Sequence, residues 1–308
     1  IKMRLNEFLG IKYPIIQGGM ANIALGEFAA AVSNAGGLGL IASGGFDAER
    51  IREEIKKCRA LTDKPFGVNL MLMNPDVDNI AKMLVEEKVD VITTGAGSPE
   101  KYVADWKAVG TKVIPVVSGV ALAKRMERMG VDALIAEGGE SGGHVGEMTT
   151  MTLVPMVVDA VNIPVIAAGG IADGRGMVAA FALGAIGVQI GTVLLASEEC
   201  PIHINYKEAV IKAKDNGTAV TGRSSGAPVR VIKNQMAREY LKMEKEGATL
   251  DELEQLTLGS LRKAVMDGDV VNGSLMAGQI AGMIQDELSC KEIITSIVSE
   301  AERLMNRK

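Results

Sequence analysis

The chain of 308 residues has few aromatic residues, three cysteines and two histidines. Aromatic residues make up 3% of it, so its core has to be built from Val, Ile, Leu, Ala and Met. Cys58, Cys200 and Cys290 lie far apart without a CxxC pair, which favours free thiols in a reducing compartment. His144 and His203 lack matching carboxylates, so the sequence predicts no catalytic zinc and no other metal site.

Long apolar runs and a strong net charge are also missing. No stretch of about 18 uncharged apolar residues occurs. The segment 154–171 comes closest, and Asp159, Asn162 and two prolines interrupt it. The first residues contain no long apolar segment of the kind found in signal peptides. We therefore expect no membrane span and a cytoplasmic location. The net charge of −5 argues against a nucleic-acid binder held by phosphate contacts.

The first two-thirds of the sequence contain short apolar segments that alternate with amphipathic ones. The apolar segments carry little charge and are rich in Val, Ile and Ala, which is typical of parallel strands buried on both faces. They are Ile15–Gly19, Gly37–Ser43, Phe66–Leu72, Val89–Gly95, Lys112–Ser118, Ala133–Gly138, Ile163–Gly170 and Gly187–Leu195. The amphipathic segments include Asp47–Leu61, Asp76–Glu87, Val120–Met129 and Thr149–Val161, with Asp47, Asp76 and Thr149 as predicted N-caps.

Eight strand–helix alternations fit either a closed barrel or a doubly wound sheet. Glycine or polar residues end nearly every apolar segment, and only a barrel brings all strand ends to one face. The sequence therefore predicts an α/β fold, a TIM (β/α)8 barrel, over residues 1–197. A small, mostly helical lid or substrate subdomain is expected over 198–272, and a C-terminal segment over 273–308 that returns to the barrel. Its amphipathic stretch is Ser289–Arg307.

Two glycine motifs close the last two predicted strands. Gly169-Gly170 follows the seventh strand and Gly191-Thr192 follows the eighth. Barrels that bind phosphorylated cofactors commonly hold the phosphate there, because glycine lets backbone amides approach an anion closely. The alternative is that these glycines only turn a strand into a helix. No GxxxxGK[ST] motif occurs, which excludes a P-loop.

Two further glycine-rich segments contain candidate site residues. His144 lies in Glu137–Gly146, after the sixth strand, where an imidazole can donate a hydrogen bond or a proton to a developing anion. We expect His203 to have a structural role or to support the site indirectly, without contacting substrate. The first strand ends in Gln17–Ala21, whose amides and Met20 suit a flat heteroaromatic ring; the alternative is a turn with a core methionine.

The predicted lid contains a group of cations. It comprises Arg223, Arg230, Lys233 and Arg238. The group is either a solvated charged face or a docking patch for an acidic partner or a phosphate-bearing substrate arm.

At these motifs the chain resembles the FMN-dependent enoyl-[acyl-carrier-protein] reductases of type II. It is similar, more distantly, to the nitronate monooxygenases, formerly called 2-nitropropane dioxygenases. The resemblance runs nearly end to end. The segments that carry it are YPIIQGGMA (13–21), VSNAGGLGLI (32–41), TDKPFGVNLML (62–72), VITTGAGSPEKY (91–102), KVIPVV (112–117), IAEGGESGGHVGEMTTMTLVP (135–155), IPVIAAGGIADGRG (163–176), VQIGT (188–192) and GSLMAGQIAG (273–282).

The resemblance implies a homodimeric flavoprotein with non-covalent FMN, NADH or NADPH as reductant, and an enoyl substrate on acyl carrier protein. It implies His144 as the active-site histidine. Residues implied near the flavin ring or ribityl chain are Gly18, Gly19, Met20, Ala21, Asn69, Thr94, Lys124 and Glu137. Those implied around the ribityl chain and phosphate are Gly142, Gly143, Gly169, Gly170, Gln189, Gly191 and Thr192.

The chain departs from the resembling family at three places. Asn22 replaces a Trp, Val193-Leu194 replaces Arg-Phe, and Gly226-Ala227-Pro228 replaces Gly-His-Pro. All three lie on the expected substrate side, so they put the acyl substrate in doubt more than the flavin. A nitronate monooxygenase and a non-catalytic flavin-binding protein remain the alternatives.

Overall fold

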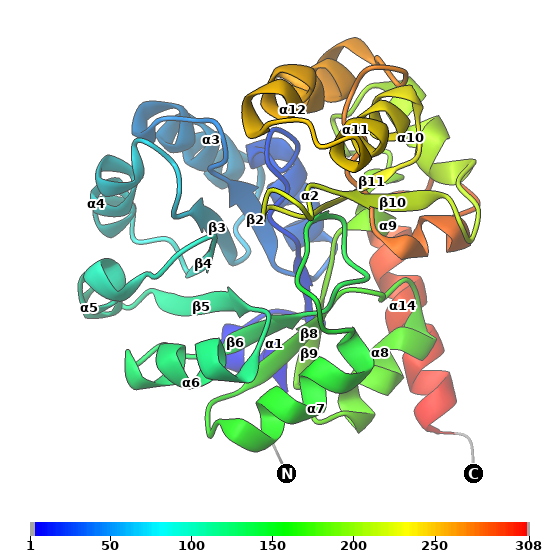
Figure 1. The fold of residues 1–308 in the computed structure, drawn as a ribbon. Coiled ribbons are helices and arrows are strands. Elements are labelled where there is room, and N and C mark those ends of the chain that lie inside the picture. The colour runs from blue at the N-terminus through cyan, green and yellow to red at the C-terminus, as the bar shows by residue number, and fades with distance from the viewer. Residues whose placement is uncertain (1–3, 307–308) are drawn as a thin grey trace.

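Eight parallel strands form a barrel in the computed structural model, which describes residues 4–306 (Figure 1). Their order around the barrel is β1-β9-β8-β6-β5-β4-β3-β2, and a bridge between Ile16 and Leu38 joins the two ends. The predicted TIM-barrel fold is confirmed. The strands are β1 (Ile15–Gln17), β2 (Gly39–Ala42), β3 (Phe66–Met71), β4 (Val91–Gly95), β5 (Lys112–Val117), β6 (Leu134–Glu137), β8 (Val165–Ala168) and β9 (Gly187–Ile190).

Two buried clusters explain the apolar strands. One cluster fills the barrel and includes Ile16, Leu40, Ile114 and Ile166, while the larger one lies between the strands and the helices around them. Each strand therefore buries both faces, which is why its sequence shows no polar alternation. Helix α1 (Leu5–Leu9) belongs to the inner cluster and closes one end of the barrel.

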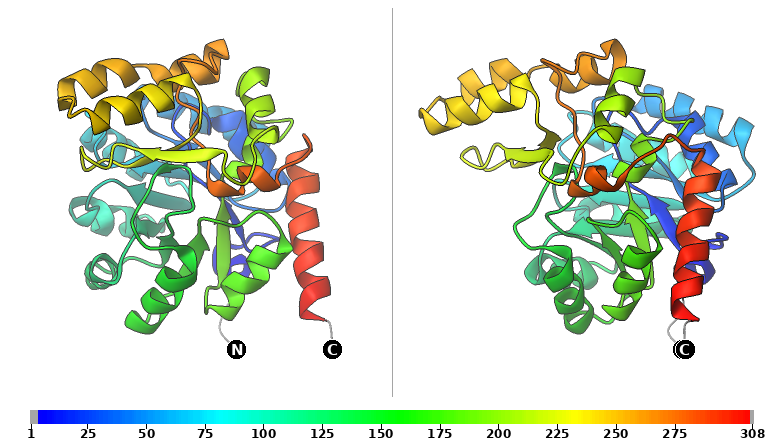
Figure 2. Two further views of the ribbon diagram at one scale, coloured as in Figure 1. Left: turned by 45° about the vertical axis from the view of Figure 1, so that its right-hand side comes forward. Right: turned by 90° about the vertical axis from the view of Figure 1, so that its right-hand side faces the viewer.

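Helices surround the barrel on its outer side. They are α2 (Gly26–Asn34), α3 (Ala48–Leu61), α4 (Val77–Glu87), α5 (Glu100–Ala108), α6 (Val120–Arg128), α7 (Thr150–Ala160), α8 (Gly174–Ala182) and α14 (Cys290–Met305). The last of these packs against α8 and α2, and Figure 2 shows it upright along the barrel wall. Helix α14 covers most of the expected amphipathic stretch Ser289–Arg307, of which residue 307 lies outside the described residues.

All three predicted N-cap residues occupy N-cap positions, but only Asp47 caps its own helix through its side chain. Asp47 accepts a hydrogen bond from the Arg50 amide, as predicted. The side chains of Asp76 and Thr149 accept no hydrogen bond from the backbone amides of their own helices. The Asp76 carboxylate instead accepts from the Ala48 amide at 2.7 Å, so it caps the neighbouring helix α3.

The eighth predicted strand was too long, because β9 ends at Ile190 and Thr192–Leu195 forms the short helix α9.

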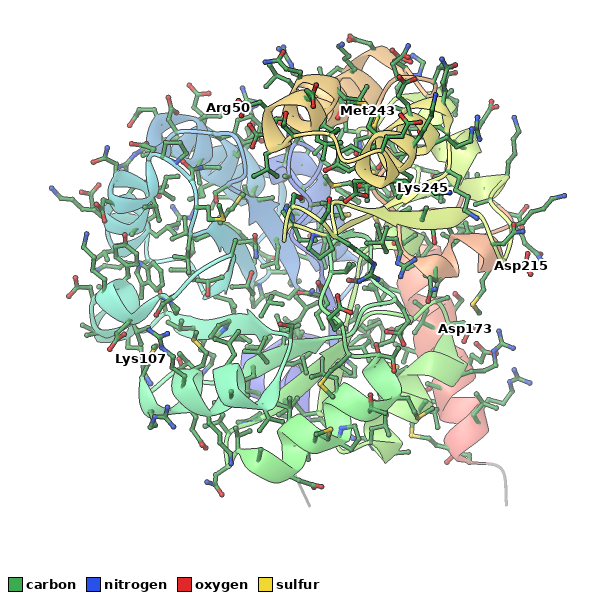
Figure 3. The ribbon with its side chains drawn as sticks, in the orientation of Figure 1. Arg50, Lys107, Asp173, Asp215, Met243 and Lys245 are labelled. Atoms are coloured by element: carbon green, nitrogen blue, oxygen red, sulfur yellow. The ribbon has the colours of Figure 1, made fainter. Side chains whose placement is uncertain are left out.

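Residues 198–272, the predicted lid, are mostly helical but also contain strands. The helices are α10 (Ile204–Ile211), α11 (Gln235–Lys245), α12 (Leu250–Thr257), α13 (Ser260–Arg262) and the π-helix η1 (Lys263–Asp267). Strands β10 (Thr218–Thr221) and β11 (Val229–Ile232) form a three-stranded antiparallel sheet with β7 (Gly143–His144) from the barrel. The sequence did not predict this sheet. Figure 3 labels Met243 and Lys245 on α11, above these strands.

A 3-10 helix, η2 (Gln279–Met283), follows the lid and leads to α14. Within residues 4–306, no helix combines the length and apolarity needed to cross a membrane.

Candidate active site at the carboxyl ends of the barrel strands

The end of β1 meets the end of β3. The Gly18 amide donates to the Ile190 carbonyl oxygen at 2.7 Å, which ties the first strand to the eighth. A side chain at Gly19 would collide with the Asn69 side chain, so only glycine fits there. The side-chain amide of Asn69 donates through Nδ2 to Thr93 Oγ1 at 2.8 Å. Three residues implied by the resemblance, Gly18, Gly19 and Asn69, therefore lie together at the barrel mouth.

The segment after β1 explains one departure from the resembling family. Asn22 has a φ of 62°, in the left-handed region, which asparagine tolerates and a bulky residue does not. The preceding Ala21 packs close to Gly44, where an added Cβ would lie 2.7 Å from the Ala21 Cβ.

Three other predicted site residues differ in exposure. Both Met20 and Ala21 are half-buried, while Thr94 is fully buried on β4.

Glu137, at the end of β6, is the titratable group most changed by the mouth. Burial disfavours its charged form and raises the pKa of its carboxyl to about 7, with the Ser141 hydroxyl opposing the shift. That hydroxyl donates to Glu137 Oε1 at 3.3 Å, and the Gln189 amide approaches Oε2 at 3.5 Å. The raised pKa favours the neutral carboxyl, which can donate a hydrogen bond as well as accept one.

Gly169 and Gly170 form a sharp backbone corner after β8, and the first residue of α7 contacts this corner. Gly169 and Gly170 have φ values of 92° and 71°, a conformation that favours glycine. The Thr150 hydroxyl is within 3.0 Å of the Gly169 carbonyl oxygen and 2.8 Å of Glu140 Oε2. A Cβ added to Gly191 would have no heavy atom within 4 Å. The two predicted phosphate motifs therefore form a corner with fixed backbone and open space beside it.

The backbone of residues 277–279 closes this corner from the other side. The Gly278 amide donates to Thr192 Oγ1 at 2.8 Å, and the Gln279 amide donates to the Glu140 carbonyl oxygen at 2.9 Å. A Cβ at Gly142 would lie 2.6 Å from the Ala277 carbonyl carbon, which gives Gly142 a packing reason of its own. Sequence reasoning assigned no role to 277–279, although the GSLMAGQIAG segment that contains it carries part of the resemblance.

His144 is exposed and lies on the two-residue strand β7. It pairs with Val229 of β11, and Gly143 pairs with Arg230. Gly143 has a φ of 74°, and a Cβ there would lie 3.7 Å from Met276 Sδ. The glycine-rich loop thus gives His144 a backbone attachment to the lid and leaves its imidazole accessible.

Two other predicted residues lie apart from the mouth. Lys124 is exposed on the outer helix α6, so its reach to a cofactor stays a prediction. His203 has the structural role expected, because it caps α10 and its Nδ1 accepts from the Asn205 amide at 3.1 Å. In the part of the chain that is described, no group of three or more His, Cys, Asp and Glu side chains is placed to hold a metal ion.

Comparisons with known proteins agree with this geometry. The family model for nitronate monooxygenase matches residues 2–87 and 79–300. The chain is 34% identical to a probable nitronate monooxygenase of Staphylococcus saprophyticus, over 100% of this chain and 99% of that protein. It is 33% identical to a (3aS,4S,5R,7aS)-5-hydroxy-7a-methyl-1-oxo-octahydro-1H-indene-4-carboxyl-CoA dehydrogenase of Mycobacterium tuberculosis, over 98% of this chain and 96% of that protein.

Solved structures give the same result. FabK from Thermotoga maritima superposes with a TM-score of 0.96 at 50% identity, over 99% of this chain and 97% of that one. A nitroalkane oxidase from Streptomyces ansochromogenes superposes with a TM-score of 0.86 at 28% identity, over 96% and 97%. Because the family model and these relatives span nearly the whole sequence, the chain belongs to the nitronate monooxygenase family of flavin-dependent oxidoreductases.

Proposed function

We propose that this chain reduces trans-2-enoyl thioesters of acyl carrier protein, with FMN as cofactor and NADH or NADPH as reductant. The observation that carries the proposal is the likeness to FabK of Thermotoga maritima, at 50% identity over 99% of the chain. FabK is an enoyl-[acyl-carrier-protein] reductase of type II, so this likeness agrees with the motifs described above. The Mycobacterium tuberculosis relative is named for a carboxyl-CoA, which is also a thioester.

The residues at the barrel mouth fit FMN. The open space at Gly191 and the left-handed backbone of Gly169 and Gly170 suit a phosphate, which needs amides without a Cβ in the way. Gly19 lies against the Asn69 side chain and has no Cβ, so the backbone there can approach the flat ring that we propose beside it. When bound, FMN supplies the hydride transfer, and the protein supplies geometry and electrostatics.

The residues proposed to hold FMN fall into two groups. Toward the ring and the upper ribityl chain they are Gly18, Gly19, Met20, Ala21, Asn69, Thr94, Lys124 and Glu137. Toward the ribityl chain and phosphate they are Gly142, Gly143, Gly169, Gly170, Gln189, Gly191 and Thr192.

His144 is the proposed catalytic residue. Reduction at the β-carbon of an enoyl thioester builds negative charge on the thioester oxygen, and a nearby imidazole stabilises that charge or delivers the proton to the α-carbon. The ladder between β7 and β11 restrains the backbone of His144, while its exposed side chain stays free to meet a substrate.

Nitronate oxidation is the second candidate, favoured by the family model and by the Staphylococcus saprophyticus relative. In that reaction His144 would serve as the base or as the group that binds the nitronate anion. In either case we expect the departures at Asn22, Val193 and Ala227 to affect the choice of substrate more than the flavin.

One pair of assays separates the candidates. Purified protein should be yellow and release FMN on denaturation. Anaerobic NADH or NADPH oxidation driven by crotonyl-CoA supports the reductase, whereas aerobic oxidation of a nitronate without nicotinamide supports the monooxygenase. A flavoprotein that turns over with neither substrate, nor with any other electron acceptor, would be a non-catalytic flavin-binding protein.

The cytoplasmic location and the homodimer are proposed from the family resemblance. Light scattering after size-exclusion chromatography measures the mass in solution and tests the dimer directly.

A further inference from the structure

Arg230, one of the four lid cations, faces the barrel loop and not the solvent. Its Nη2 and Nε donate to the Gly139 carbonyl oxygen at 2.9 and 3.3 Å, and its Nη1 donates to Thr218 Oγ1 at 3.1 Å. The residue is half-buried, and desolvation lowers the pKa of its guanidinium. These contacts leave the guanidinium unsuited to the docking patch that the sequence allowed.

The backbone of Arg230 binds the same loop at a second point. In the ladder between β11 and β7, Arg230 pairs with Gly143 and Val229 pairs with His144. The Val145 amide continues this contact by donating to the Pro228 carbonyl oxygen at 3.1 Å. Arg230 therefore holds the loop both at Gly143, directly before the histidine, and at Gly139, four positions earlier.

The base of the loop is closed next to the point that the guanidinium binds. The Gly139 amide donates to the Met148 carbonyl oxygen at 2.8 Å. Between this closure and the histidine the chain passes through Gly142 and Gly143, which restrict the backbone little. A flexible loop of this kind keeps one geometry only where outside groups restrain it, because ordering it costs conformational entropy.

We infer that Arg230 is a positioning residue for His144, and that it does so by clamping the segment Gly139–Gly143 of the barrel loop to strand β11 of the lid. This inference rests on the proposed function for its consequence in catalysis. Arg230 itself need not touch substrate or cofactor. The fork of an arginine suits the role, because it reaches one carbonyl with two nitrogens and Thr218 with the third.

A neighbouring contact offers a contrast. Arg223 pairs with Glu147 of the same loop at 2.7 Å, but their side chains are 53% and 80% exposed. Solvent screens a pair of this kind, so it restrains the loop little.

The first test needs no substrate. Hydrogen exchange of a peptide spanning residues 139–148 is measured by mass spectrometry on FMN-saturated protein. Arg230→Met keeps an unbranched stem and removes the donors, and it should raise the exchange rate by about 10- to 100-fold, as expected for losing a charge-assisted hydrogen bond. Arg238→Met, on an exposed residue of α11, makes the same change in charge and should leave the rate unchanged.

The second test separates positioning from general destabilisation. In stopped-flow experiments on the same proteins, reoxidation of the reduced flavin by crotonyl-CoA should slow by about 10-fold or more in Arg230→Met. Reduction by the nicotinamide should stay within roughly twofold. Arg230→Lys, which retains one donor for the Gly139 carbonyl, should recover part of the rate.

Two results would overturn the inference: unchanged exchange in 139–148, or equal slowing of both half-reactions. If the wild-type flavin is not reoxidised by crotonyl-CoA at all, the proposed function fails, and the exchange measurement still decides whether Arg230 clamps the loop.

Discussion

The barrel mouth and the lid hold their functional residues by different means. At the mouth, Asn69 lies in β3 and pairs with residues of both neighbouring strands, while Glu137 ends β6 and pairs with Ala168 of β8. His144 instead lies on a strand of two residues that pairs with β11 of the lid. The cofactor side is therefore built into the barrel, while the substrate side depends on the lid. Mutations should separate cofactor retention from substrate chemistry.

The largest effect is expected in the barrel, from Gly170→Asp. The carboxylate would repel a phosphate, it would lie against the Glu140 side chain, and its residue would take a φ of 71°. We expect complete loss of FMN, measured as flavin absorbance per protein after desalting.

Gly170→Ala is the control for backbone strain, since it places a Cβ 3.4 Å from the Glu140 Cβ without adding charge. It should weaken FMN binding without abolishing it. Stoichiometric FMN in the aspartate variant would mean that the phosphate lies elsewhere.

The next effect concerns the lid side, at His144. His144→Ala should retain FMN, and its reduction by the nicotinamide should change little, because that step builds no enolate. Reoxidation by enoyl substrate should slow by roughly 10²–10⁴-fold, the range for losing a positioned proton donor or oxyanion partner. Stopped-flow absorbance of the flavin follows each half-reaction separately.

His203→Ala serves as the matched control. It removes the cap of α10, which costs about 1 kcal/mol of stability, and should leave reoxidation unchanged. Equal reoxidation rates in the His144 variant and the wild type would remove His144 from the mechanism.

A smaller effect of the barrel is a pH dependence caused by Glu137. Its pKa rises from 4.5 to about 7 on folding, so between these values the folded chain binds more protons than the unfolded chain. The contribution of Glu137 to the free energy of unfolding of the flavin-free protein is therefore fully present below pH 4.5. It is lost as the pH rises through 7.

Glu137→Gln removes the titration. The melting temperature of the flavin-free variant should gain on the wild type between pH 5 and pH 8. A constant difference between the two proteins across that range would show that Glu137 does not titrate there.

The smallest effect is expected at the lid surface. Arg223→Met breaks the exposed pair with Glu147, and double-mutant cycles on such pairs give about 0.2–1 kcal/mol. Urea unfolding should detect a change of that size at most, and it should shrink in high salt. A loss of several kcal/mol would contradict the distinction drawn between Arg223 and Arg230.

The barrel was predictable from the sequence because its strands bury both faces. Segments such as Gly39–Ala42 and Val165–Ala168 are continuous apolar runs, and the glycines after them mark the strand ends. The same reasoning placed Gly19 and Asn69 at one face, since parallel strands end together, but it did not predict their direct contact.

The lid sheet was not predictable in this way. Strand β7 has two residues in a glycine-rich loop, and its partner lies more than eighty positions later, so no local periodicity indicates the pairing. The role that we infer for Arg230 depends on this pairing, so it could not be predicted from the sequence either. The contact of Asp76 with α3 was not predictable for a related reason, because its carboxylate binds an amide of another helix that is distant in the sequence.

The position of α14 has a consequence for the order in which the protein is made. This helix packs against α8 and α2, yet the chain reaches it only after the whole lid. Its buried side, which includes Ile293, Ile294 and Ile297, is therefore the last part of the barrel wall to leave the ribosome. Until then the nascent barrel exposes an apolar strip on α2 and α8, and a chain that stops before residue 290 keeps that strip open.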